Sequence, residues 1–213
     1  MLARLRAGQH GAGTFQANTD QTRYRTGLAP HPRMPRPTAT IRTEPLQQLQ
    51  CLGTAGAMQE ALLVALGGSR FFDDFTRDNI ARLTHAMQIY RAESGQTIIR
   101  EGDVDDYMLF IIEGRINIVK TDPFGERRAM TSVGPGGTLG EMSMIDGEPR
   151  FATCIALDVT TFAVFRRDAM VQIIMEEPAL GAKVLIKLVT LLSQRLRDTS
   201  TNLLHSLSRS DAV

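Results

Sequence analysis

The sequence of 213 residues lacks the features that mark several classes of protein. It has only two cysteines, Cys51 and Cys154, too few for a disulfide framework in a chain of this size. No apolar run approaches the roughly 18 residues that a membrane-spanning helix needs. The four histidines are scattered, so no Cys/His spacing suggests a metal site. These absences predict a cytoplasmic protein with no membrane segment, no cofactor and no metal, in which Cys154 is a buried structural thiol.

The net charge is small, +1, but it is unevenly distributed along the chain. Residues 1–44 carry seven arginines against two acidic residues, whereas residues 45–213 carry 17 basic and 21 acidic side chains. Because a mildly acidic body matches a phosphate backbone poorly, direct DNA binding is not expected. The first 44 residues are rich in Gly, Pro, Thr, Gln and Arg and lack aliphatic periodicity, which predicts a disordered tail. Alternatively, translation begins at Met58 and the tail is not made.

The sequence before the β-rich part of the chain has helical patterns. Residues 45–67 predict a helical lead-in that stops at a Gly-Gly pair. In the segment that follows, Thr76 or Asp73 is a candidate N-cap for a short helix with Ile80 and Leu83 on one face. These helices are expected to pack at the N-terminal side of the main domain.

Residues 68–177 are predicted to form the main domain, in which short β-rich runs alternate with glycine-containing turns. The runs YMLFIIE, RINIVK and TTFAVFR are typical, and such strands recur at roughly 8–12-residue spacing. This spacing favours an all-β barrel or a double-sheet roll. The predicted fold class is therefore α+β, mainly β: an eight-stranded antiparallel β-roll or jelly roll flanked by N-terminal helices and a long C-terminal helix.

After Arg166 the apolar period becomes helical. A short helix is expected to end before Pro178, and residues 178–213 then predict one long helix. One stripe of this helix consists of Leu185, Leu188, Leu192, Leu196, Leu203 and Leu207. A two-stranded coil with a second copy of the chain is the plainest way to bury the stripe, so a homodimer is expected. The alternative is that the stripe packs back on the roll.

The stretch GEMSMIDGEPRFAT combines a glycine, an acid and a base in one short loop. Gly136, Gly137 and Gly140 let backbone N–H groups approach a ligand closely, and consecutive free N–H groups can hold an anion. Arg150 adds a permanent charge and a fork matched to phosphate oxygens, whereas ionised Glu141 only accepts hydrogen bonds. This pattern fits a ligand with a phosphate on one side and a hydroxyl on the other. The loop is expected to be accessible at the surface, so Arg150→Glu is expected to abolish phosphate binding and to leave the fold intact. The alternative is a surface ion pair between Glu141 and Arg150 that holds the loop.

The segment Gly140–Thr153 resembles the phosphate-binding cassette of cyclic nucleotide-binding domains, the family of the catabolite activators and of the regulatory subunits of cAMP-dependent kinase. The resemblance extends over about residues 68–207. It includes the FF-x-x-F motif, the REGD turn at 100–103 and FIIEGRI at 110–116. It implies a β-roll sensor that binds a cyclic mononucleotide, with cAMP as the leading candidate, and it implies no catalytic residue.

The resemblance also assigns roles within the cassette. Glu141 would bind the ribose 2′-hydroxyl and Arg150 the exocyclic phosphate oxygens, while the backbone N–H groups of Ser143 and Phe151 would complete the phosphate cradle. The implied ligand-binding residues are Gly140, Glu141, Met142, Ser143, Arg150, Phe151 and Ala152. A second group is expected to line the sugar and base pocket: Met130, Thr131, Leu139, Thr199 and Ser200.

Two departures from the family pattern bear on function. Phe151 stands where a small residue is usual, so the base of the nucleotide stays open. The chain ends at Val213, which leaves no room for a helix-turn-helix domain.

The leading hypothesis is a stand-alone sensor that relays ligand binding through its C-terminal helices to a dimer partner or to a client protein. The alternatives are an interaction module without a ligand, a transcription regulator acting through a partner, and a cupin-like enzyme, which the lack of clustered histidines disfavours.

Overall fold

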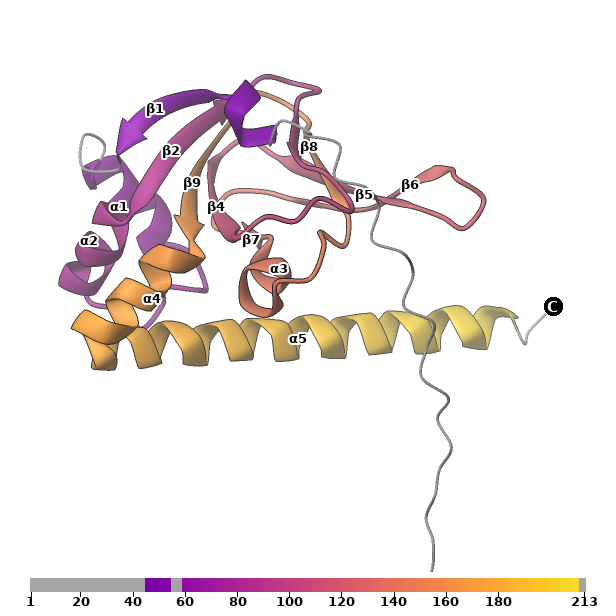
Figure 1. The fold of residues 1–213 in the computed structure, drawn as a ribbon. Coiled ribbons are helices and arrows are strands. Elements are labelled where there is room, and N and C mark those ends of the chain that lie inside the picture. Colours follow the sequence, from indigo (N-terminus) through magenta and orange to yellow (C-terminus); the bar gives the residue numbers. More distant parts are fainter. Residues whose placement is uncertain (1–44, 55–58, 211–213) are drawn as a thin grey trace, which may run out of the picture. The chain divides into compact units, whose positions relative to one another are not determined.

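The structure, a computed structural model, describes residues 45–54 and 59–210 (Figure 1). The helices are α1 (Gln59–Gly67), α2 (Arg77–His85), α3 (Glu141–Asp146), α4 (Arg167–Glu176) and α5 (Pro178–Ser210), preceded by a 3₁₀ turn at Pro45–Gln48. The strands are β1 (Gln50–Thr54), β2 (Met87–Ala92), β3 (Thr97–Ile99), β4 (Tyr107–Glu113), β5 (Ile116–Thr121), β6 (Arg127–Val133), β7 (Thr138–Leu139), β8 (Thr153–Ala156) and β9 (Thr160–Arg166). The predicted tail at 1–44 and the alternative start at Met58 lie outside the described residues.

The strands form two antiparallel sheets, with the orders β1-β2-β9-β4-β7 and β3-β8-β5-β6. This confirms the predicted α+β roll with its long C-terminal helix. The described residues contain nine strands, however, where the sequence predicted eight. The difference includes β1, which lies within the 45–67 segment that was expected to be helical. Its pairing with the edge of β2, where Cys51 lies opposite Tyr90, outweighs the local helical pattern.

Strand β4 lies between two apolar clusters. Tyr107, Leu109 and Ile111 belong to the cluster between the two sheets, whereas Met108 and Phe110 belong to the cluster between the five-stranded sheet and the helices. Because both faces of β4 are covered, the strand is a continuous apolar run and does not alternate. The four-stranded sheet is thereby held over the five-stranded one, and the cassette loop connects β7 of one sheet to β8 of the other.

Helix α2 begins with a capping box. The Thr76 hydroxyl accepts a hydrogen bond from the N–H of Asn79, and the Asn79 side chain accepts one from the N–H of Thr76. Thr76 is therefore the N-cap, and Ile80 and Leu83 are buried as predicted. Each such cap contributes about 1 kcal/mol to helix stability.

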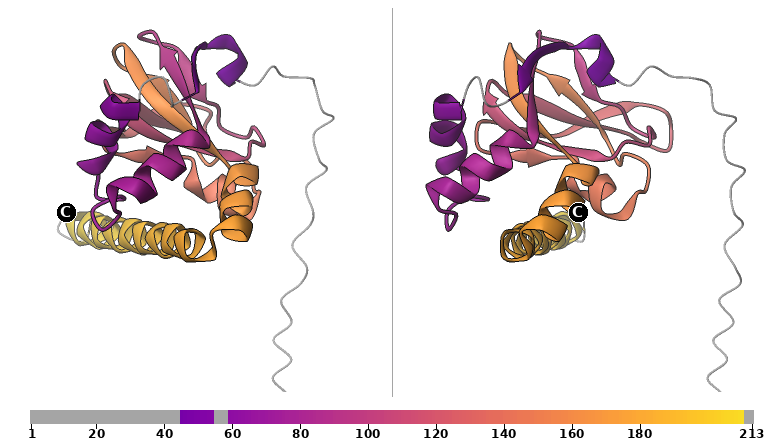
Figure 2. Two further views of the ribbon diagram at one scale, coloured as in Figure 1. Left: turned by 90° about the vertical axis from the view of Figure 1, so that its left-hand side faces the viewer. Right: turned by 60° about the vertical axis from the view of Figure 1, so that its left-hand side comes forward.

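Helix α5 is anchored to the body through its first half. Figure 2 shows α4 leading directly into α5, which begins at Pro178. Leu180, Val184 and Leu188 are buried in the cluster that also contains Phe75. Lys187 reinforces this contact through ion pairs with Asp73 and, at 3.2 Å, with Asp74. The first half of α5 is therefore part of the domain.

Only part of the predicted leucine stripe is open to solvent. Leu188 is buried, whereas Leu196 and Leu203 are 69% and 58% exposed. Leu185 is also exposed, and the side chain of Leu207 lies outside the described residues. The structure therefore agrees in part with each alternative from the sequence. One end of α5 packs on the roll, whereas the other end presents apolar side chains to solvent. Within the described ranges, none of the helices has the length and apolar character that a bilayer crossing requires.

Candidate ligand-binding site

The cassette is built around helix α3, which follows β7 directly. Gly140 precedes the helix with a φ of 83°, a left-handed conformation that suits glycine. A Cβ at this position would lie 2.5 Å from Arg150 Nη1 and 3.0 Å from the Tyr107 carbonyl oxygen. The first N–H groups of α3 have no acceptor within their own helix. The N–H groups of Gly136 and Gly137 instead donate to the carbonyls of Ile111 and Gly134, so these two glycines do not offer free donors as the sequence suggested.

Arg150 is buried at the centre of the site and is only 2% exposed. Its Nε donates to Asp105 Oδ2 at 3.2 Å and its Nη1 donates to the Gly140 carbonyl at 2.8 Å. The guanidinium carbon also lies 4.3 Å from the centroid of the Tyr107 ring. Its Nη2 is buried and has no hydrogen-bond partner among the described residues. The sequence predicted an accessible loop, and for this residue the prediction was wrong because Arg150 is buried. Asp105, Gly140 and Tyr107 hold its guanidinium.

Glu141 is equally buried, with an exposure of 1%, and it pairs with a residue far along the chain. Its Oε1 accepts from Arg195 Nη1 of helix α5. Arg195 Nη2 donates to the Thr138 carbonyl at 2.5 Å. Glu141 Oε2 is buried and, within the described part of the chain, unpartnered. The alternative of a Glu141–Arg150 ion pair is thus wrong, since each residue pairs with a different partner.

A cavity of about 100 Å³ joins these groups. Its lining consists of Ile99, Ile118, Leu139, Gly140, Glu141, Met142, Ser143, Arg150, Phe151, Ala152, Cys154 and Arg195. The structure therefore brings together all seven cassette residues singled out in the sequence, and Leu139 with them. It also places Arg195 on the cavity, which sequence reasoning missed although Arg195 lies one helical turn before Thr199.

Four residues of the second predicted group lie away from this cavity. Met130 and Thr131 are on β6, an edge strand whose residues are largely exposed. Thr199 and Ser200 are exposed, and their hydroxyls donate to the carbonyls of Arg195 and Leu196 in their own helix, as hydroxyls in helices commonly do. Their part in ligand binding stays a prediction.

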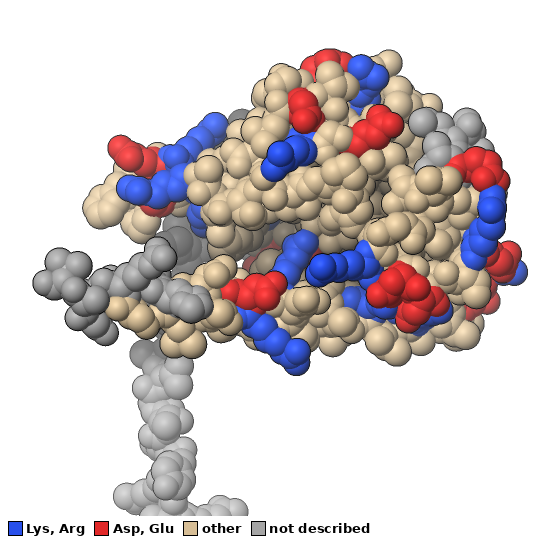
Figure 3. All heavy atoms as spheres, turned by 180° about the vertical axis from the view of Figure 1, so that it is seen from behind, with Lys and Arg blue, Asp and Glu red and all other residues tan. Residues whose placement is uncertain are grey.

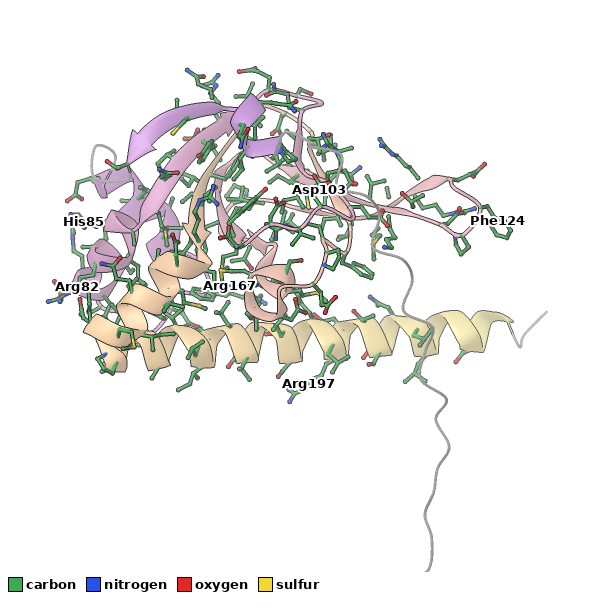
Figure 4. The ribbon with its side chains drawn as sticks, viewed as in Figure 1. Arg82, His85, Asp103, Phe124, Arg167 and Arg197 are labelled. Atoms are coloured by element: carbon green, nitrogen blue, oxygen red, sulfur yellow. The ribbon has the colours of Figure 1, made fainter. Side chains whose placement is uncertain are left out.

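Arg167 supports the cassette from the first turn of α4. Its Nη2 donates to the Ser143 carbonyl at 2.7 Å and its Nε to the Met144 carbonyl at 2.5 Å. Figure 4 shows Arg167 lying between α4 and α3. Since carbonyls in the last turn of a helix lack partners within it, a guanidinium there stabilises the short helix. The cassette is thereby connected to the helices that follow the roll.

The remaining ionisable groups set limits on the chemistry of the site. Burial raises the pKa of the Cys154 thiol to about 12, so the thiol stays protonated at neutral pH. Cys154 is therefore the buried structural thiol that the sequence predicted. In the described residues, no cluster of three or more His, Cys, Asp or Glu side chains is arranged to hold a metal ion. On the face shown in Figure 3, basic and acidic side chains are interspersed.

Comparison with known proteins agrees with this geometry. The family model of the cyclic nucleotide-binding domain matches residues 90–177. The crystal structure of a cyclic nucleotide-binding domain from Methylobacillus flagellatus is 38% identical in sequence, with a TM-score of 0.68. That match covers 76% of this chain and 95% of the other. The similarity therefore includes both the roll and the cassette.

Two further proteins match this chain over part of their own length. The "CRP-like cAMP-activated global transcriptional regulator" of Mycobacterium tuberculosis is 31% identical over 124 residues, which are 58% of this chain and 54% of the regulator. The crystal structure of the Thermus thermophilus Catabolite Activator Protein is 25% identical, with a TM-score of 0.58, over 63% of this chain and 62% of the other. The match thus spans about half the length of the Mycobacterium regulator.

Proposed function

Because this chain belongs to the cyclic nucleotide-binding domain family, we propose that it is a regulatory sensor that binds a cyclic mononucleotide in the cassette cavity. cAMP is the first candidate ligand, since the Mycobacterium relative is described as cAMP-activated. In this proposal Arg150 binds the phosphate and Glu141 binds the ribose hydroxyl.

Two unpartnered polar atoms carry the proposal. Among the residues that the structure describes, Arg150 Nη2 is a buried donor without an acceptor, and Glu141 Oε2 is a buried acceptor without a donor. Buried polar atoms are normally hydrogen-bonded, because an unmade bond costs about 1–3 kcal/mol and more for charged groups. Both residues line the same cavity. A ligand with an anionic oxygen and a hydroxyl at short range would satisfy both atoms, and the cyclic phosphate and 2′-hydroxyl of a nucleotide supply this pair.

The cavity also supports a link between binding and helix α5. At about 100 Å³ it is well below the roughly 300–1,000 Å³ of ordinary small-molecule sites. Arg195 of α5 is one of its walls and already holds one oxygen of Glu141. We propose that an entering nucleotide shifts Arg195, and that α5 carries this shift to a dimer partner or to a client protein. The ligand would then stabilise the state in which Glu141 binds the ribose hydroxyl and Arg195 has moved away from it.

The proposal includes no chemical step and no contact with DNA. The assigned role of Arg150 is to bind a ground-state phosphate, and a permanently charged guanidinium cannot act as a base. Basic and acidic side chains alternate on the face of Figure 3, which gives a phosphate backbone no single-sign surface there. The cytoplasmic location expected from the cysteine content is part of the same proposal.

Binding of 2′-deoxy-cAMP tests the role of Glu141. We expect the full-length chain to bind cAMP about 10–100-fold more tightly than 2′-deoxy-cAMP, because a hydrogen bond to a charged group contributes about 1.5–3 kcal/mol. In Glu141→Ala the acceptor is gone, so the two ligands should bind alike. Isothermal titration calorimetry of both ligands against both proteins measures the difference.

Glu148→Ala is the matched control for Glu141→Ala. Glu148 lies in the same loop but is exposed, so its removal should leave the preference for the ribose hydroxyl unchanged. If the unsubstituted chain bound the two ligands equally, Glu141 would not contact the hydroxyl and its assigned role would be wrong.

A ligand-free interaction module is the second candidate, and one observation favours it. Arg195 already neutralises Glu141, and the cavity is small, so the site is partly filled by the protein itself.

A thermal-shift titration with cAMP, cGMP and cyclic di-GMP separates the two candidates. A ligand that binds only the folded state raises its stability by RT ln(1 + [L]/Kd), so a sensor must show a shift. The absence of a shift with any nucleotide would support the interaction module.

A second copy of the chain is the partner that we propose for the exposed apolar stripe of α5. Leu185, Val189, Leu196 and Leu203 are all exposed and recur at steps of 4, 7 and 7 residues, the spacing of a two-stranded coil. Arg197 of the same helix points away from the roll in Figure 4. An apolar stripe of this kind on a long helix is most simply covered by its own copy.

Leu196→Asp tests this dimer. We expect it to weaken the dimer by about 2 kcal/mol or more, a factor of about 30 in the dissociation constant, because a charge would enter the apolar seam. Sedimentation velocity over a concentration series measures the change. Val64→Asp is the control, since Val64 is 77% exposed on helix α1. A chain that is monomeric at every concentration before substitution would contradict the dimer.

A further inference from the structure

The residue directly after Arg150 presents an aromatic ring at the cavity. Phe151 lines the cavity and is 53% exposed, whereas the neighbouring wall residues Ile99, Leu139 and Cys154 are buried. Exposure of a large apolar ring is unfavourable in water, so a half-exposed phenylalanine on a ligand cavity marks a surface that a ligand can cover. Phe151 is therefore a half-exposed aromatic residue of the cavity lining.

Lys120 of strand β5 holds Phe151 in place. Its ammonium nitrogen lies 4.4 Å from the centroid of the Phe151 ring and donates to the Phe151 carbonyl at 2.7 Å. It also donates to Glu101 Oε1 at 2.6 Å. One ammonium group thus contacts both the backbone and the ring of the same residue. The cation attracts the ring face, which fixes the ring before any ligand arrives.

Glu101 keeps the lysine in position. Its second carboxylate oxygen accepts from the N–H of Thr121 at 3.0 Å, and its own N–H donates to Thr153 Oγ1 at 3.1 Å. Burial raises the pKa of Glu101, but hydrogen bonds from Lys120 and Thr121 outweigh it and hold the pKa below its usual value. The carboxylate is therefore ionised at neutral pH, and Lys120 is tied to two segments of the chain.

The remainder of the wall shows which part of a ligand would meet the ring. The polar lining side chains are Glu141, Ser143, Arg150 and Arg195, and the proposed function assigns phosphate and ribose to this group. The half-exposed apolar wall residues are Phe151 and Met142. A nucleotide with its phosphate on Arg150 has one large apolar surface left, its base. Aromatic rings and thioether sulfurs are favourable neighbours for such a flat π-system.

We propose that Phe151, held by Lys120, is the platform on which the base of the bound nucleotide stacks, and that it makes the site prefer a two-ring purine to a one-ring pyrimidine. This inference rests on the proposed function. A ring that is fixed before binding loses little conformational freedom when the base arrives, so stacking stabilises the complex without a large ordering cost. A purine covers more of the ring than a pyrimidine does, and the preference follows from the larger contact.

Affinities for four cyclic nucleotides test the platform. We expect the full-length chain to bind cAMP and cGMP at least about tenfold more tightly than cCMP and cUMP, as measured by isothermal titration calorimetry. Phe151→Leu keeps an apolar side chain of similar size without a π face. It should weaken purine binding about tenfold and pyrimidine binding much less, so that the preference disappears. Lys120→Met keeps the ring but frees it, and should give a smaller loss in the same direction.

Ring-current shifts supply a second readout that a merely structural role would not produce. The base protons of bound cAMP should move upfield in proton NMR with the unsubstituted chain and return toward their free positions with Phe151→Leu. Phe124→Leu is the matched control. Phe124 is 89% exposed and lies at the tip of the β5–β6 hairpin, away from the cassette (Figure 4), so its replacement should change neither affinity nor shifts.

Three results would overturn the inference. Equal binding of purines and pyrimidines by the unsubstituted chain would show that the ring does not read the base, while nucleotide binding itself would stand. Tighter binding of all four nucleotides by Phe151→Leu would show that the ring obstructs the site. Failure of every nucleotide to bind the unsubstituted chain would instead remove the proposed function, and the platform with it.

Discussion

Arg150→Lys is expected to raise the Kd for the cyclic nucleotide about 100-fold while the chain still folds. Lysine keeps a positive charge beside Asp105 but loses the planar fork, so the donor that is unpartnered in this structure, Nη2, disappears. Isothermal titration calorimetry measures the affinity, and thermal unfolding measures the stability. Unchanged affinity in this variant would mean that the phosphate does not bind at Arg150.

Arg150→Ala and Arg150→Glu should instead damage the fold. The side chains of Arg150 and Asp105 are 1% and 3% exposed, so removal of the arginine leaves a buried carboxylate without its partner. Breaking a buried pair in this way typically costs about 3–5 kcal/mol. Charge reversal is worse, because two carboxylates would then face each other. The sequence analysis expected an accessible loop and therefore an intact fold in Arg150→Glu. Because Arg150 is buried, we now expect this variant to lose stability.

Arg128→Lys is the control for the lysine substitution. Arg128 also pairs with an aspartate, Asp122, but its side chain is 70% exposed. Exposed pairs contribute only about 0–1 kcal/mol, so neither stability nor affinity should change measurably. The comparison separates the loss of an exposed arginine from the loss of the buried Arg150, which lines the cavity.

Gly140→Ala is expected to raise the Kd about 100-fold, because a methyl group at this position would displace Arg150, the residue proposed to bind the phosphate. The added Cβ would lie 2.5 Å from Arg150 Nη1 and 3.0 Å from the Tyr107 carbonyl. The Arg150 side chain has little room to retreat, since Asp105 and the Tyr107 ring hold it. Titration calorimetry gives the affinity, and thermal unfolding should show a lower midpoint.

Gly95→Ala separates backbone strain from this steric conflict. Gly95 has the same φ of 83° as Gly140, but a Cβ there would meet nothing within 4 Å. It should therefore show only the strain of a left-handed alanine, about 1–2 kcal/mol of stability, and normal nucleotide affinity. If the two variants bound nucleotide equally well, the close approach of Gly140 to Arg150 would have no functional role.

Local pattern was enough to predict most of the elements. The runs YMLFIIE and TTFAVFR became β4 and β9, and Thr76 became the cap of α2, because strand length, turn residues and caps depend on neighbours in the sequence. The segment at β1 shows where this fails. The local pattern of the 45–67 segment predicted a helix, but the pairing of Gln50–Thr54 with β2 makes this part a strand.

The leucine stripe of α5 shows a similar limit. Its period revealed a long helix with one apolar side, but not what covers that side. The structure buries Leu188 against the body and leaves Leu196 and Leu203 exposed, although all three belong to one pattern. Periodicity records which residues share a face, whereas burial depends on where the body ends along the helix.

The sequence by itself determined the family, the β-roll and the cassette. The glycine, the glutamate and the Pro-Arg pair lie close together along the chain, at the spacing of the family pattern. Only the tertiary structure decided the partners of the two charged residues. Asp105 is 45 positions before Arg150, and Arg195 is 54 positions after Glu141. No local period connects such positions, and only the closing of the roll and the docking of α5 bring these charges together. Since a buried charge needs a partner, those distant contacts set both the shape of the site and its link to helix α5.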